Sequence, residues 1–177
     1  MLTRFEFAPV PTVIGDGHYR PRMASRRSQI SMTADEVQAY LQSERILNVA
    51  TIGPSGHPHL VAMWYAWVGG ELSFWTFAKS QKIRNLHRDG KMTGLVESGV
   101  SYHELRGVEL IGRGRLIDDY DQVLEIGKAV AVRYNGEAAI SDAALPFVEA
   151  QARKRMGVVF EVESFVSWDH TKLGGTY

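Results

Sequence analysis

The first thirty residues show no sustained alternation of hydrophobic and polar positions. They hold three of the six prolines, Pro9, Pro11 and Pro21, and a turn-type run at 15–17. Proline and glycine clusters without periodicity are typical of extended or irregular chain. The pattern therefore predicts an extended arm over residues 1–30 and a folded domain over residues 31–177.

A helical pattern begins directly after this arm. Thr33 and Glu36 have the spacing of a capping box, in which each side chain accepts a hydrogen bond from the other residue's backbone N–H. The apolar residues that follow recur every three to four positions, which places them on one helix face. The sequence predicts a helix over 34–43 that begins at Thr33.

From Ile46 onward the period of the hydrophobic pattern falls to two, which is typical of β-strands. We predict strands over 46–52, 59–68 and 71–77, with the second strand buried on both faces. A Gly-Pro-Ser-Gly turn at 53–56 and a Gly-Gly hairpin at 69–70 separate them. These signals together predict a three-stranded antiparallel meander.

The rest of the chain alternates between the two periods. Gly112 and Gly114 interrupt one of the later strands and predict a bulge or a barrel corner there. No βαβ alternation is present, so the pattern favours a small antiparallel β-barrel with inserted helices, a mainly β fold with some α. The further elements predicted are strands over 92–96, 105–117 and 158–166, helices over about 80–90, 119–134 and 141–155, and a polar tail over 167–177.

Composition narrows the function classes. Twenty Lys and Arg residues balance twenty Asp and Glu residues, so no global positive field exists to hold a nucleic acid. The absence of cysteine excludes disulfides, thiolate nucleophiles and cysteine-bound zinc or iron–sulfur clusters. No stretch resembles a signal peptide or a membrane span. We expect a cytoplasmic protein with no membrane or nucleic-acid partner.

Common catalytic motifs are absent from the chain. It has no Gly-x-Ser-x-Gly nucleophile elbow, no phosphate-binding loop and no dinucleotide-binding glycine pattern between a strand and a helix. His57 and His59 have the spacing of a metal pair on a strand, but Pro58 between them favours a turn that leads into a strand. We predict no metal site.

Positive charge is concentrated in one segment of this neutral chain. Residues 79–91 contain five basic residues and one acidic residue. Lys79, Ser80 and Lys82 fall where a strand passes into a helix, and such a junction offers free N–H groups and cations to a phosphate. A solvated basic helix face is the alternative. Tryptophans at 64, 67 and 75 on the preceding strands could flank a flat ring or belong to the barrel core.

Three motifs in order carry a resemblance to a known family: the Gly-Pro-Ser-Gly turn after the strand at 46–52, the run Ser80-x-Lys82-x-x-Asn85-Leu86, and the tail 167–172. Over about residues 32–173 the chain resembles the pyridoxamine 5′-phosphate oxidase-like split barrels, especially their flavin- or deazaflavin (F420)-dependent oxidoreductases. The resemblance implies an FMN-binding-like antiparallel split β-barrel. It also implies a homodimer with two cofactor sites at the subunit interface, each formed in part by the partner chain.

The resemblance further assigns cofactor-binding residues by position. Those expected to line the ring are His59, Val61, Met63 and Trp64, and those along the ribityl chain are Trp75, Thr76 and Ala78. Lys79, Ser80 and Lys82 would bind the phosphate, and Asn85 would support the turn. Trp168 and Lys172 would come from the other subunit.

The function implied is an oxidoreductase that uses reduced F420, or alternatively FMN, to transfer hydride to a small organic substrate without a dedicated catalytic base. A non-catalytic split-barrel protein that holds flavin or haem is the other interpretation. Residues 18–28 contain four arginines and no acid, which predicts contact with the carboxylate tail of F420, unless the arm is simply solvated. Nothing matches the substrate-phosphate residues of true pyridoxamine phosphate oxidases.

Overall fold

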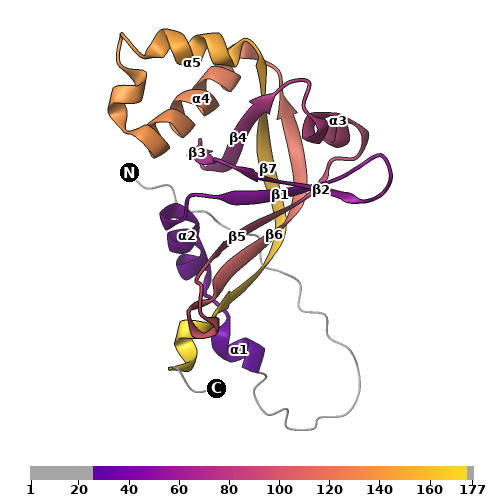
Figure 1. Cartoon of the computed structure of the whole chain (residues 1–177), viewed down its shortest axis with the longest axis vertical. Helices are drawn as coiled ribbons and strands as arrows, with labels where there is room; N and C mark the ends of the chain where they lie inside the picture. The colour runs from indigo at the N-terminus through magenta and orange to yellow at the C-terminus, as the bar shows by residue number, and fades with distance from the viewer. Residues whose placement is uncertain (1–25, 175–177) are drawn as a thin grey trace.

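The computed structural model describes residues 26–174, which form one seven-stranded sheet with five α-helices (Figure 1). Every strand pair is antiparallel, and the strand order is β2-β1-β5-β6-β7-β4-β3. The strands are β1 (Leu47–Ile52), β2 (Pro58–Met63), β3 (Ala66–Val68), β4 (Glu71–Phe77), β5 (Lys91–Ser98), β6 (Arg106–Ile117) and β7 (Arg155–Asp169). The antiparallel β fold predicted from the sequence is confirmed.

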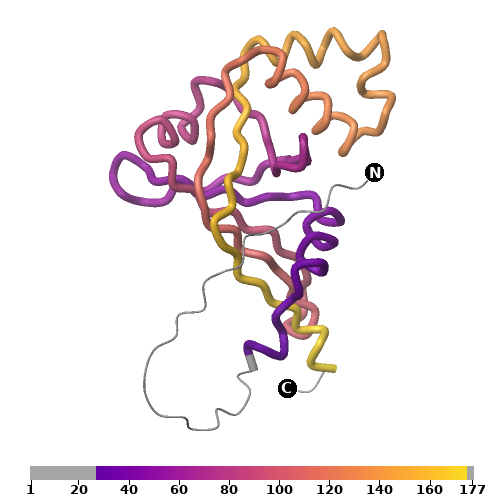
Figure 2. The backbone as a smooth tube through the Cα atoms, turned by 180° about the vertical axis from the view of Figure 1, so that it is seen from behind, coloured from indigo at the N-terminus to yellow at the C-terminus, as the bar shows by residue number. Residues whose placement is uncertain are grey.

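Five α-helices and three short 3₁₀ turns accompany the sheet within residues 26–174. The α-helices are α1 (Arg26–Ile30), α2 (Ala34–Ser43), α3 (Gln81–Arg88), α4 (Tyr120–Asn135) and α5 (Leu145–Ala152). Short 3₁₀ turns form η1 (Tyr102–Glu104), η2 (Glu137–Ile140) and η3 (His170–Leu173). Helices α4 and α5 lie together at one end of the molecule, and α1 and η3 at the other (Figures 1 and 2). No helix within residues 26–174 is long and apolar enough to cross a membrane.

The predicted capping box at the start of α2 is present. The Thr33 side chain accepts a hydrogen bond from the Glu36 N–H at 3.3 Å, and the Glu36 carboxylate accepts one from the Thr33 N–H at 2.7 Å. Helix α2 then buries Val37, Tyr40 and Leu41, the apolar face that the sequence indicates. Of the predicted arm, residues 1–25 lie outside the described residues and residues 26–30 form α1.

The single strand predicted over 59–68 is wrong. Trp64 and Tyr65 break it, and the two pieces, β2 and β3, occupy opposite ends of the strand order. Tyr65 is fully buried, and its hydroxyl donates to the carbonyls of Leu41 at 2.6 Å and Glu44 at 3.0 Å. The sheet therefore curls so that β2 and β3, its two edge strands, are joined by a two-residue corner. We call the region where these two edges of the sheet meet the barrel seam.

Two further predictions for this region are also wrong. The meander is wrong because β2 pairs with β1 alone and β4 pairs with β3 and β7. Burial of β2 on both faces is also wrong, since Leu60 on its outward face is 64% exposed. As an edge strand, β2 packs only its inward side chains, Val61 and Met63, against the core.

The barrel interior holds the main hydrophobic core. Inward side chains of the strands meet α2 and α3 there, among them Leu47, Val49, Phe74, Val96, Val108, Leu110, Val158, Leu41 and Ile83. A second cluster lies between α4, α5 and the outward face of β4 and β7. The predicted helix over 141–155 is only partly correct: the helix begins at Leu145, and Pro146 sits in its first turn, where a missing N–H costs nothing.

The bulge predicted at the glycines of β6 is confirmed. The register between β6 and β7 shifts between Ile111 and Gly112, and a Cβ atom on Gly112 would lie 2.0 Å from the carbonyl oxygen of Glu161. Only glycine allows this approach of two backbones. Strand β7 continues to Asp169, so the tail predicted from residue 167 begins as strand.

Replacing Gly112 by alanine should therefore lower the free energy of unfolding by about 2 kcal/mol or more, because the new methyl group overlaps fixed backbone. Urea denaturation measures this change. Gly69→Asn is the matched control: its Cβ meets nothing within 4 Å, and Asn tolerates the φ of +58°. Equal stability of Gly112→Ala and wild type would contradict the account of the bulge.

Candidate active site at the barrel seam

Polar groups without an anionic partner gather where β4 passes into α3. Lys82 is only 8% exposed, and its ammonium donates to the Thr76 hydroxyl at 2.9 Å. No Asp or Glu within residues 26–174 forms an ion pair with it. Ser80 is the N-cap of α3 by backbone conformation, but its hydroxyl makes no capping hydrogen bond. That hydroxyl is buried and bonds to no described residue.

Burial lowers the pKa of the Lys82 ammonium, and the positive charge of Arg155 lowers it further. A charged group removed from water is destabilised unless an opposite charge compensates it. The junction therefore offers a cation and a hydroxyl beside the first, unused N–H groups of a helix. This is the donor set that a phosphate group requires.

Asn85 fixes this junction to the barrel wall. It is fully buried, its amide donates to the Thr51 hydroxyl of β1 at 3.0 Å, and its carbonyl oxygen accepts from Gln81 at 2.8 Å. The backbone N–H of Ala78 donates to the carbonyl of Lys154 at 3.1 Å, which ties the other side of the junction to the chain before β7. Lys79 is exposed at the rim.

The predicted ring-binding residues lie on β2 and at the corner that follows it. His59, Val61 and Met63 alternate on the inward face of this edge strand, and His59 Nδ1 is buried without a described hydrogen-bond partner. Met63 and Trp64 line a hollow of about 320 Å³ together with Trp75 of β4. The structure thus brings Met63 and Trp64 close to Trp75 of β4.

Within residues 26–174, no group of three His, Asp or Glu side chains is placed to hold a metal ion.

Trp168 and Lys172 lie elsewhere in the same chain. Trp168 pairs with Gly107 at the start of β6, far along β7 from the residues that pair with β4, and lines an outward hollow with Leu60 and Leu95. The ammonium of Lys172 donates to Glu36 at 2.7 Å and to the carbonyl of Ser31 at 2.8 Å. The charge of Lys172 is therefore engaged within its own chain.

The sequence analysis missed Arg155. It begins β7 opposite Phe77, and its guanidinium lies 4.6 Å from the Trp75 ring centre and 5.0 Å from that of Phe77. The sequence predicts a helix over 141–155, which places Arg155 at a helix end rather than at the start of a strand. Only the pairing of β7 with β4 brings Arg155 to the seam, and no local pattern in the sequence reveals that pairing.

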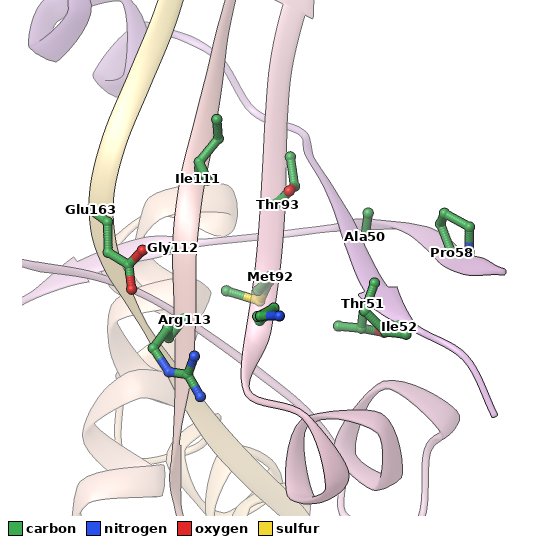
Figure 3. Close-up of a pocket in the computed structure, with 11 residues that line it drawn as sticks. Ala50, Thr51, Ile52, Pro58, Met92, Thr93, Ile111, Gly112, Arg113 and Glu163 are labelled. Carbon is green, nitrogen blue, oxygen red and sulfur yellow. The ribbon is translucent and has the colours of Figure 1, made fainter. Parts of the chain in front are cut away.

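A separate hollow of about 420 Å³ lies on the outward face of β1, β5 and β6 (Figure 3). Its labelled lining includes Ala50, Ile111 and Met92, with Arg113 and Glu163 at one side. None of the predicted cofactor residues lines it.

Comparison with known proteins places the chain among similar folds. The family model described as pyridoxamine 5′-phosphate oxidase matches residues 33–169. A solved conserved hypothetical protein from Mycobacterium tuberculosis is 40% identical, with a TM-score of 0.79 over 85% of this chain and 93% of that one. No curated protein matches significantly.

Two more distant solved structures share the fold. An F420 reductase is 24% identical, with a TM-score of 0.56 over 72% of this chain and 94% of that one. The haem storage protein HutZ from Vibrio cholerae is 12% identical, with a TM-score of 0.60 over 77% and 96%. The curled seven-stranded sheet is thus the split barrel expected from the sequence, and the chain belongs to the pyridoxamine 5′-phosphate oxidase family.

Proposed function

We propose that the protein is an oxidoreductase whose flavin-type cofactor, F420 or FMN, binds in the barrel seam. The observation that carries the proposal is the buried Lys82 ammonium, which lacks a carboxylate among the described residues and lies on the same strand-to-helix junction as the unbonded Ser80 hydroxyl. A phosphate at this junction compensates the charge of Lys82 and gives the Ser80 hydroxyl a partner. Membership in the family supports a phosphate-bearing cofactor at this place.

The chain contributes binding and orientation rather than acid–base chemistry. When bound, the cofactor supplies hydride transfer. Of the side chains that line the hollow at the seam, Arg155 is the only ionisable one. The apolar side chains of Met63, Trp64 and Trp75 exclude water from the ring, and the fixed phosphate sets its orientation.

Two copies of the chain are proposed to complete the site. The outward face of the sheet exposes Ile52, Leu60 and Ile111, and Trp168 lines a hollow on the same face. A large apolar surface of this kind is typical of a protein interface. A Trp168 presented by the partner then closes the cofactor seam from outside, a role it cannot fill within its own chain.

Cofactor choice is proposed to favour F420. Arginines at 20, 22, 26 and 27 carry no acidic neighbour within residues 18–28, and F420, unlike FMN, ends in several carboxylates. Ordering a chain segment costs conformational entropy, which charge pairing with such a tail offsets.

Lys82→Met should weaken FMN binding about tenfold to a hundredfold, because one charge-assisted contact to the phosphate is lost. The free energy of unfolding of the cofactor-free protein should fall by no more than about 1 kcal/mol, since an uncompensated buried cation is removed with the hydrogen bond to Thr76. Calorimetric titration and urea denaturation measure the two quantities.

Lys91→Met is the control for this change, because it removes an exposed positive charge from the same basic segment. Its FMN affinity should equal that of the wild type. Unchanged affinity in Lys82→Met would remove the phosphate assignment. A haem spectrum on addition of haemin, with no binding of FMN or F420, would favour the non-catalytic carrier instead.

The proposed interface predicts a particle of about twice the 19.8 kDa chain mass in analytical ultracentrifugation. Leu60→Glu places a charge on the outward face and should yield monomers that bind FMN at least tenfold more weakly. Phe147→Glu alters a side chain that is 75% exposed on α5, away from this face, and should stay dimeric. A monomeric wild type would refute the interface.

Removal of residues 1–28, which takes out all four arginines of the basic segment, should weaken F420 binding several-fold and leave FMN binding nearly unchanged. The difference should be largest at low salt, where pairs of exposed charges are least screened. Fluorescence titrations with both cofactors at two salt concentrations test this. If the shortened chain binds both cofactors as the full chain does, the basic segment has no part in recognition.

A further inference from the structure

The hollow between the β2–β3 corner and α4 combines aromatic walls with a cation. Its lining consists of Met63, Trp64, Trp75, Val130, Ala131, Asn135 and Arg155. At about 320 Å³ it has the size of a small-molecule pocket. Two tryptophan rings, one side of α4 and one arginine form a site that suits a flat molecule with a negative charge.

Trp64 is held rigidly although it is 48% exposed. Its ring stacks on Tyr134 of α4 with centroids 4.4 Å apart and planes 8° apart. The Tyr134 hydroxyl donates to the carbonyl of Arg45 at 2.5 Å and accepts from the Tyr65 N–H at 3.1 Å. An exposed aromatic ring fixed in this way is a preformed platform, because binding to it costs little side-chain entropy.

Trp75 is fixed from the opposite side of the hollow. A Cβ atom on Gly127 of α4 would lie 2.5 Å from the Trp75 ring, so the helix touches the ring with bare backbone. The Arg155 guanidinium lies 4.6 Å from the ring centre. The indole therefore lies in contact with both α4 and Arg155, and it keeps the guanidinium beside the hollow.

The positive charge of Arg155 lacks an acidic partner among the described residues. Its side chain donates two hydrogen bonds to the amide oxygen of Gln151, at 3.2 and 3.4 Å, and forms no ion pair within residues 26–174. Burial lowers the pKa of this guanidinium, which reflects the cost of leaving its charge uncompensated. A carboxylate would remove that cost through two parallel hydrogen bonds.

This cation is separate from the proposed phosphate site. Thr76, which binds Lys82, points inward from β4 with Phe74 and Leu72, whereas Trp75 and Phe77 point outward with Arg155 above them. Lys82 is not among the residues that line the hollow. Strand β4 thus has one cation on each face, Lys82 on the inward face and Arg155 on the outward face. Each of the two cations requires a separate anion.

We propose that this hollow is the substrate pocket and that its ligand is a planar carboxylic acid, with the ring on Trp64 and the carboxylate on Arg155. Asn135 at the end of α4 adds an amide donor at the rim. The identification as a substrate rests on the proposed function, because Met63 and Trp64 line this hollow and are also expected to line the cofactor ring. The binding of a planar carboxylate by itself does not depend on a cofactor.

The experiment is a calorimetric titration of the cofactor-free full-length protein with naphthalene-2-carboxylate and with its neutral isostere naphthalene-2-carboxamide. Wild type should bind the carboxylate about tenfold to a hundredfold more tightly than the carboxamide. Arg155→Met should abolish that preference. Arg153→Met is the matched control, because the Arg153 guanidinium stacks on Tyr120 at 5.1 Å and lines no part of the hollow, and it should keep the preference.

A second variant keeps the test valid if Arg155→Met is poorly folded. Ala131→Phe fills the hollow from α4 and should abolish binding of both probes. Equal binding of carboxylate and carboxamide by wild type, or tight carboxylate binding by either hollow variant, overturns the proposal.

FMN and F420 titrations separate this proposal from the phosphate assignment. FMN affinity should fall about tenfold to a hundredfold in Lys82→Met and by much less in Arg155→Met. A loss in Arg155→Met as large as that in Lys82→Met would assign the arginine to the cofactor phosphate and overturn the proposal. Competition between F420, but not FMN, and the naphthalene carboxylate would assign Arg155 to the cofactor tail and overturn the substrate role. Independent binding of F420 and the carboxylate supports it.

Discussion

The burial of Tyr65 is the constraint on which the rest of this barrel depends. Its hydroxyl donates to the carbonyls of Leu41 and Glu44 at the end of α2. Arg133 of α4 donates to these two carbonyls and to that of Gln42 at 2.7 to 3.1 Å, and its guanidinium lies over the Tyr65 ring. One side chain therefore joins two helices to the corner of the sheet. Because Tyr65 turns inward there, Trp64 turns outward, the strand ends, and the seam with its candidate cofactor and ligand sites lies open.

Local signals in the sequence predict local structure well. The capping box at Thr33 and the bulge at Gly112 depend on neighbours a few residues away or on the special geometry of glycine, and both are present as expected. The strand break at Trp64 has no such signal, since apolar residues continue through it. What breaks the strand is the bond between Tyr65 and Leu41, and sequence periodicity carries no information on contacts of that kind.

The residues of the candidate site show the same difference between local signals and long-range contacts. Lys79, Ser80 and Lys82 are close together in the sequence, so the strand-to-helix pattern groups them, and the resemblance to a family adds Thr76 and the residues of β2. Arg155 joins them only through the register of β7 on β4, which was not predicted. Lys172 was expected to serve a partner subunit, yet the carboxylate of Glu36, which local pattern assigned to helix capping alone, binds it within the chain.

The contacts between the start of α2 and residues 167–172 have a consequence for the biosynthesis of the chain. Glu36 caps α2 and also binds Lys172, and the Met32 N–H donates to the Ser167 hydroxyl at 3.0 Å. Helix α2 thus obtains these contacts only from residues that are translated more than 130 residues later. Until they emerge, its apolar face has no complete barrel to cover, so the nascent chain depends on the ribosome surface or on chaperones to shield it.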